Sequence, residues 1–479
     1  MCNVLVRPIS FSHKRQNDRD RRQFRRFLLI VAFVLCATAC VQKPPENSTV
    51  TNASQPPANT DGASNSTASR PPSGESQVPV TLPLVDAMLQ DESFANDAKS
   101  SLQITDEQIQ KLSDAARDDI LHLDETDQDT PRSTRAATKK AEQTIKQVLG
   151  ADKGNQFIAF VRERGAGVNA ETTTVPNSVP TDTRIVINSP GYRMDIFENG
   201  KLVKTYMVGI GYPEFPLPTG LRKADKIIFN PPWTPPDSPW VKGKFRPGKT
   251  VEPGSKDNPL GILKIPIGLP NLIHGGKRPD RLGNFASHGC VGLTNDLVRE
   301  FALEVAKLSN TPLTLDQIHE YEREKTESKD VKLQSAVPVE LRYETIVVQN
   351  GKLIIYRDVY EKGTNTEENL RRVLDAAGVS FDSFSQTEQQ QMREALQRMA
   401  VDAVGNPVDE NDTNKESKSS TRETKNVKGL KDITLEFPQL AGQGYPDPVN
   451  LAGQVPEKKQ DRGSNTSSRR NKTAANRAP

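Results

Sequence analysis

Residues 271–295 read NLIHGGKRPDRLGNFASHGCVGLTN, and this stretch contains the residues best suited to chemistry. It contains His274, His288 and Cys290, and so holds two of the five histidines and one of the four cysteines. A thiol is mostly protonated at neutral pH. A cysteine nucleophile therefore needs an imidazole that accepts its proton and backbone amides that hold an oxyanion. Cys290 is a candidate nucleophile, and the two histidines are its candidate bases.

The local spacing favours this interpretation but leaves two others open. His288 lies two residues before Cys290, on the same face if the chain is extended, whereas the fold must bring His274 across. Gly289 and Gly292 leave the backbone on either side of the thiol open to a substrate. Two histidines and a cysteine are also three-quarters of a zinc site, although no CxxC or fourth ligand accompanies them. A lone cysteine is often an inert core residue, but this polar run is a poor core strand.

Composition limits how much of the chain can be globular. The 479 residues are 34% hydrophobic and 26% charged, which is a thin supply of core-forming side chains. The net charge is +3 from 64 basic and 61 acidic residues, so no nucleic-acid partner is expected for the chain as a whole.

Residues 1–40 are typical of an export signal. A basic stretch leads into the short apolar run 27–39, which is too short to span a bilayer as a helix. The segment ends Ala37-Thr38-Ala39-Cys40 and resembles a bacterial lipobox, which predicts lipidation at Cys40 and a membrane anchor. The chain is then expected in the periplasm or cell envelope. An ordinary signal peptide or an uncleaved anchor is the alternative.

The cysteines limit what crosslinks the mature chain can form. Cys2 and Cys36 would leave with the signal, and Cys40 would carry lipid. Cys290 would then be the one free thiol, so no intramolecular disulfide is expected. An unpaired cysteine in an exported protein is consistent with a reactive thiol.

Composition and periodicity predict the remaining organisation. After the signal we expect a flexible tether at 41–81, a module of three or four helices at 82–164, a linker at 165–183 and a β-rich catalytic domain at 184–318. A connector with a solvated run at 319–332, a β-hairpin and two helices should follow at 319–404, and a disordered tail at 405–479.

Turn and cap signals support these assignments. Asn199-Gly200 and Asn350-Gly351 are typical hairpin turns, and the second hairpin is expected to begin at Pro338. The spacings Thr105-x-x-Gln108 and Thr387-x-x-Gln390 predict capping boxes at the starts of two helices. A strand ending at 272–273 should bring His274 to a strand edge, and one amphipathic helix should cover 297–308.

Residues 184–315 resemble the catalytic domain of bacterial L,D-transpeptidases, the YkuD domain. Its signature is a His-Gly followed after a loop by Ser-His-Gly-Cys and a nearby Asn. In this sequence these are His274-Gly275, the run 287–290, and Asn295. The run 230–233, which ends at Trp233, and the runs 218–220 and 258–261 accompany the signature in the same order. The resemblance implies an α+β fold with a mainly β catalytic domain, preceded here by the helical module and flanked by disordered segments.

The resemblance also implies roles for individual residues. Cys290 corresponds to the nucleophile, His274 to the general base and Gly275 to the carbonyl that orients the imidazole. His288 with Gly289 would shape the oxyanion and substrate pocket. The remaining candidates for substrate binding are Ser287, Gly292, Asn295 and Trp233. Gly292 departs from the pattern, since the family usually has Arg or Asn there; Arg278 or Arg281 could supply the missing cation.

The implied activity is a cysteine acyl transfer on peptidoglycan stem peptides without a cofactor or metal. The cysteine would form a thioester with a stem tetrapeptide and pass the acyl group to an amine, giving a 3-3 crosslink or attaching a protein. Carbapenems would acylate the same cysteine. The alternatives are an L,D-carboxypeptidase or amidase on stem peptides, and an inactive lipoprotein that binds the wall.

Overall fold

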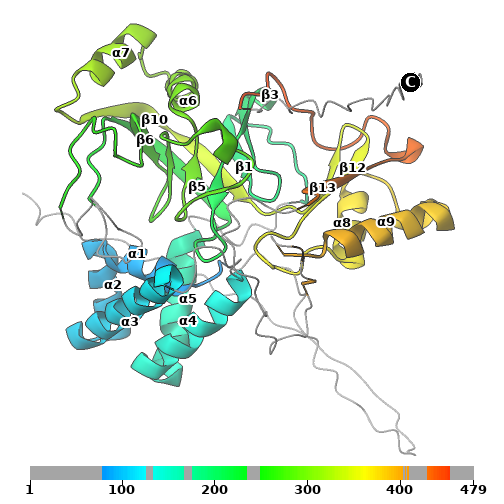
Figure 1. The fold of residues 1–479 in the computed structure, drawn as a ribbon. Helices are drawn as coiled ribbons and strands as arrows, with labels where there is room; N and C mark the ends of the chain where they lie inside the picture. Colours follow the sequence, from blue (N-terminus) through cyan, green and yellow to red (C-terminus); the bar gives the residue numbers. More distant parts are fainter. Residues whose placement is uncertain are drawn as a thin grey trace, which may run out of the picture. The chain divides into compact units, whose positions relative to one another are not determined.

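A computed structural model describes residues 78–125, 133–166, 175–234, 249–402, 405, 407–408 and 429–453 (Figure 1). The predicted signal segment, Cys40 and most of the tether lie outside these residues. Within the described part of the chain, no helix is both long enough and apolar enough to cross a membrane.

The N-terminal module contains five helices among its described residues, where the sequence predicted three or four. The capping box is confirmed, because Thr105 and Gln108 exchange backbone-to-side-chain hydrogen bonds of 3.1 and 3.2 Å. Small and aliphatic side chains, including Ala98, Leu112 and Ile145, are fully buried between the helices. The helices are α1 Leu82–Leu89, α2 Glu92–Leu102, α3 Asp106–Glu125, α4 Thr134–Leu149 and α5 Ala151–Ala166.

Among the described residues, the main sheet has eight strands in the order β3-β2-β1-β10-β5-β6-β7-β9. Its strands are β1 Arg184–Asn188, β2 Arg193–Glu198, β3 Lys201–Met207, β5 Gly220–Phe229, β6 Leu263–Pro266, β7 Leu272–His274, β9 Val291–Gly292 and β10 Lys329–Arg342. The turn between β2 and β3 places Asn199 and Gly200 at φ 51° and 78°. Positive φ at both residues is the type I′ geometry that the Asn-Gly pair predicted. A two-stranded sheet pairs β4 Ile210–Gly211 with β8 Phe285–Ser287.

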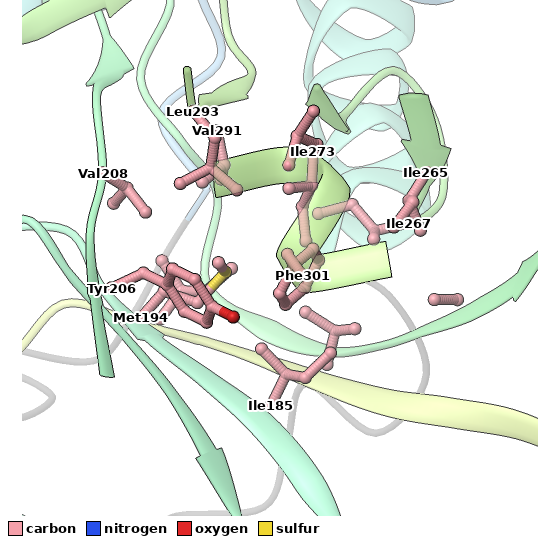
Figure 2. Close-up of a cluster of buried hydrophobic side chains, with 14 of the residues drawn as sticks. Ile185, Met194, Tyr206, Val208, Ile265, Ile267, Ile273, Val291, Leu293 and Phe301 are labelled. Carbon is pink, nitrogen blue, oxygen red and sulfur yellow. The ribbon is translucent and has the colours of Figure 1, made fainter. Parts of the chain in front are cut away.

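One side of the main sheet carries the hydrophobic core. Figure 2 shows side chains from β1, β2, β3, β6, β7 and β9 converging on Phe301 of helix α6, Asn295–Leu308. The helix begins two residues before the predicted range, because Thr294 caps it through a hydrogen bond from the Leu297 amide. Ile273 and Val291 are fully buried in this core. The residues that alternate with them on β7 and β9 therefore face the opposite side of the sheet.

Strand β10 corrects the interpretation of residues 319–348. It pairs parallel to β1 and antiparallel to β5, so the main sheet continues beyond residue 318. The charged run 319–332 is not simply a solvated connector, since it contains most of helix α7, Leu315–Arg323, and the start of β10. Pro338 belongs to β10 instead of the second hairpin. The first half of β10 is largely exposed, which is why its sequence has the polarity of a connector.

The C-terminal sheet pairs β11 Ile346–Gln349, β12 Lys352–Tyr356 and β13 Asp432–Glu436. Figure 1 shows helices α8 Glu367–Ala376 and α9 Gln386–Met399 beside this sheet, and their apolar side chains share its core. The predicted cap at Thr387 was wrong, because Ser385 and Glu388 form the capping box of α9. The tail was also not wholly disordered: β13 and a turn of 3-10 helix, Pro438–Leu440, lie within it.

Candidate active site

The strand register brings the two predicted catalytic residues onto one face of the sheet. Strands β7 and β9 are parallel neighbours in which Ile273 pairs with Val291 and His274 with Gly292. Continuing this register by two residues along an extended chain puts Cys290 on the face that carries His274. That face is opposite the one on which Ile273 and Val291 enter the core.

His274 is held by the backbone around it. Its Nδ1 lies 2.8 Å from the carbonyl oxygen of Gly275. A carbonyl oxygen only accepts, so Nδ1 carries the proton and the lone pair is on Nε2. His274 was predicted to lie at a strand edge, but it lies inside the sheet and is 3% exposed. The reason is that β7 is flanked on both sides, by β6 and β9.

Burial keeps the imidazole neutral. It lowers the pKa of His274 to about 3, and the positive charge of Lys277 acts in the same direction. The carbonyls of Gly275 and Leu260 oppose this shift without reversing it. At neutral pH, His274 is therefore a neutral base that can accept a proton.

Cys290 is a free, half-buried cysteine immediately before β9. Burial raises the pKa of its thiol, while a hydrogen bond with the Leu272 backbone and the charges of Lys277 and Lys264 act to lower it. The net direction favours the thiol. Together with the lowered pKa of His274, this indicates a neutral thiol and a neutral imidazole in the resting protein instead of a preformed ion pair.

We expect alkylation of Cys290 by iodoacetamide to keep accelerating as the pH rises past 9. The thiolate is the reactive form, and a raised pKa moves its formation to higher pH. The measurement is the rate of alkylation against pH, with the Cys290→Ser chain as the control for the other thiols. A rate that levels off below pH 8 would instead reveal a thiolate already formed by ion pairing.

The turn before the cysteine is fixed by side-chain contacts. The Cys290 amide donates to Ser287 Oγ at 3.0 Å, and this hydroxyl donates to the Cys290 carbonyl. Gly289 has φ +90°, a conformation that side chains disfavour. Asn271 donates from Nδ2 to the Gly289 carbonyl at 2.5 Å. Ser287 therefore shapes the cysteine turn, and Asn271 supports it, although no sequence motif marks Asn271 for this role.

His288 is exposed and lies against two aromatic rings. Its imidazole meets Phe215 edge-on at 4.7 Å between ring centroids and Tyr212 at 5.4 Å. Both aromatic residues lie in the segment between β4 and β5, and neither was predicted as part of the site. These contacts make His288 and Phe215 candidates for the wall of a substrate pocket beside Cys290.

Two other predicted binding residues have backbone partners. Asn295 accepts at Oδ1 from the amides of Gly276, at 2.8 Å, and Ile262, at 3.3 Å. It thereby fixes the segment that follows His274. Trp233 is half-buried and pairs through its backbone with Val251. The substrate-binding roles proposed for both residues stay predictions.

The two arginines suggested as replacement cations have partners of their own. Arg278 is exposed and forms an ion pair with Asp280 at 2.7 Å. Arg281 donates to the Phe285 carbonyl and to the Tyr212 hydroxyl. Neither interaction directs the guanidinium at Cys290. No cluster of three or more potential metal ligands occurs among the residues that the structure describes.

Comparison with known proteins defines the class of this domain. Residues 182–314 match the family described as YkuD, the L,D-transpeptidase catalytic domain. The likeness to this family extends over that part of the chain, and members of the family are acyltransferases acting on peptidoglycan peptides.

Two curated proteins illustrate the extent of the match. "Putative L,D-transpeptidase YqjB" of Bacillus subtilis strain 168 is 24% identical over 170 residues, which cover 34% of this chain and 89% of that protein. "Probable L,D-transpeptidase YbiS" of Escherichia coli strain K12 is 31% identical over 121 residues, which cover 24% of this chain and 39% of that protein.

Solved structures give a weaker likeness. The catalytic domain of the E. faecium L,D-transpeptidase aligns over its full length, 100%, with 34% of this chain at 17% identity and a TM-score of 0.22. An L,D-transpeptidase from Mycobacterium smegmatis aligns over 58% of its length with 33% of this chain, at 14% identity and a TM-score of 0.20.

Proposed function

We propose that this chain is a peptidoglycan L,D-transpeptidase of the cell envelope, with Cys290 as nucleophile and His274 as general base. The observation that carries the proposal is the placement of a half-buried thiol and a buried, neutral imidazole on one face of adjoining strands. A neutral imidazole can accept the thiol proton as the sulfur attacks a carbonyl. The family match over 182–314 supports the same reaction class.

The first half-reaction makes the thioester. His274 Nε2 accepts the thiol proton while Sγ bonds to the carbonyl carbon at the L-centre of the diamino acid in a donor tetrapeptide. The carbonyl becomes an oxyanion, for which backbone amides at the cysteine turn are candidate donors. The bond to the terminal D-Ala nitrogen then breaks, and this amine leaves with the proton from His274. The donor is left as an acyl group on sulfur.

The second half-reaction transfers the acyl group. An amine of a second stem attacks the thioester and gives its proton to His274. The sulfur leaves and regains a proton, so the protein returns to its starting state. With a stem amine the product is a 3-3 crosslink; a lysine amine would attach a protein, and water would release a tripeptide.

Delivery to the wall is part of the proposal and rests on the sequence. The export signal and the lipobox-like end at Cys40 would place the chain in the periplasm or cell envelope, held to a membrane by lipid. The polar stretch 41–77 is long enough to let a folded part reach beyond the lipid surface.

Incubation with sacculi that contain tetrapeptide stems tests the proposed function. We expect new crosslinked dimers that have lost one D-Ala, detected by mass spectrometry of the digested muropeptides. The Cys290→Ser chain is the matched control. Tripeptides without dimers would identify a carboxypeptidase, and unchanged material from a folded protein would leave a wall-binding role.

A further inference from the structure

The side chain of Lys277 occupies the space that a side chain at residue 292 would fill. A Cβ placed on Gly292 would lie 2.7 Å from Cγ of Lys277 and 2.9 Å from its Cε. Real Cβ atoms do not approach other atoms so closely. The lysine side chain can therefore lie against residue 292 in this position only because that residue has no side chain.

The backbone holds Lys277 in this position. Its amide donates to the Leu293 carbonyl at 3.0 Å, which ties the residue to the end of β9. The preceding residue, Gly276, donates to Asn295 Oδ1 at 2.8 Å. The backbone is thus held at both Gly276 and Lys277. These two residues belong to the segment that directly follows His274.

The charge of Lys277 acts on the reacting groups. It opposes the rise that burial causes in the pKa of Cys290 and adds to the fall that burial causes in the pKa of His274; burial lowers the pKa of Lys277 itself to about 8. Within the part of the chain that the structure describes, no carboxylate forms an ion pair with this lysine. A partly buried cation without an anion is unfavourable, and a bound carboxylate would relieve that cost.

Other cations near the site fit this role less well. Arg278 is engaged by Asp280, and Arg281 donates to the Phe285 carbonyl. Lys264 lies on β6 opposite His274 and also acts on the thiol, but Asp330 partly offsets its charge.

We propose that Lys277 binds the carboxylate of the departing residue of the donor peptide and that Gly292 is the gap through which it reaches the site. The inference rests on the proposed function, because it assigns a specificity-determining residue to that reaction. The terminal D-Ala carboxylate is one residue from the carbonyl that Sγ attacks. A cation close enough to act on the thiol can therefore bind this carboxylate while the thioester forms.

The test compares two donors that differ only at the terminus: the tetrapeptide acid and its C-terminal carboxamide. Release of the terminal residue gives kcat/KM for each. We expect the wild-type chain to favour the acid by about 10- to 100-fold, the range for a hydrogen bond to a charged group. Lys277→Met should remove this preference by slowing only the acid, whereas Lys277→Arg should keep much of it.

Two further variants separate recognition from general damage. Gly292→Ala leaves the lysine in the chain but forces it to move, so it should weaken the preference as well. Arg278→Met removes a neighbouring exposed cation and should leave the preference unchanged.

The outcomes distinguish this inference from the proposed function. A wild-type protein that releases neither terminal residue would overturn the proposed function. An active wild type whose preference survives in Lys277→Met would overturn this inference alone. Equal slowing of both donors in Lys277→Met would also overturn it, because the lysine would then act on the thiol or the fold instead of on the carboxylate.

Discussion

Cys290→Ser is expected to abolish the covalent adduct that a carbapenem forms with the protein and to reduce crosslinking by on the order of 10³-fold or more. The substitution exchanges sulfur for oxygen with little change in volume. The hydroxyl, however, is far harder to deprotonate with the same neutral imidazole. Burial already disfavours the thiolate form of Cys290. The same burial would disfavour an alkoxide at this position, so the site does not help a serine to lose its proton.

Intact-mass spectrometry after incubation with a carbapenem measures this effect. The wild-type protein should gain one drug mass and the Cys290→Ser protein none. The other cysteines, Cys2, Cys36 and Cys40 where they are retained, are internal controls for nonspecific acylation. A Cys290→Ser chain that still gains the drug mass would place the nucleophile elsewhere. Equal melting temperatures would show that loss of the adduct is not loss of the fold.

His274→Asn is expected to slow thioester formation by about 10²- to 10⁴-fold, which is the usual contribution of a positioned base. Asparagine can keep a donor toward the Gly275 carbonyl but has no nitrogen that accepts the thiol proton. Because His274 is 3% exposed, we also expect the free energy of unfolding to fall by about 1–3 kcal/mol.

Single-turnover acylation, followed with denaturant unfolding of the same preparation, separates these two effects. The matched control is His319→Asn, which changes an exposed histidine of α7 and should alter neither quantity. If the His274→Asn protein is folded and acylates at the wild-type rate, another group removes the thiol proton.

The candidate pair, Cys290 and His274, could be proposed from the sequence because the signals that suggest it are local. His274 ends a short apolar strand, and the Ser-His-Gly-Cys run supplies both the thiol and the glycine that its turn requires. The turn signals were equally local, since Asn199 and Gly200 determine their hairpin by their own φ preferences. The burial of His274 was not predictable, because it depends on which strands lie on either side of β7.

Long-range contacts account for what the sequence did not reveal. Strand β10 joins the main sheet more than a hundred residues after its partner β1. Its first half is polar and largely exposed, so its sequence does not show the alternation of apolar and polar residues that predicts a strand. Strand β13 is five residues long and lies within a polar tail, but it completes the C-terminal sheet. The close approach of the Lys277 side chain to Gly292 involves two separate segments of the chain, so it could be recognised only from the folded structure.

The most direct test of the account is to locate the acyl group. Wild-type protein acylated by a carbapenem would be cleaved with trypsin, whose cuts after Arg281 and Arg299 release residues 282–299. The mass of the drug should appear on this peptide, and fragmentation should assign it to Cys290. An adduct on any other peptide, or no adduct on a folded protein, would contradict the assignment of Cys290 as the nucleophile.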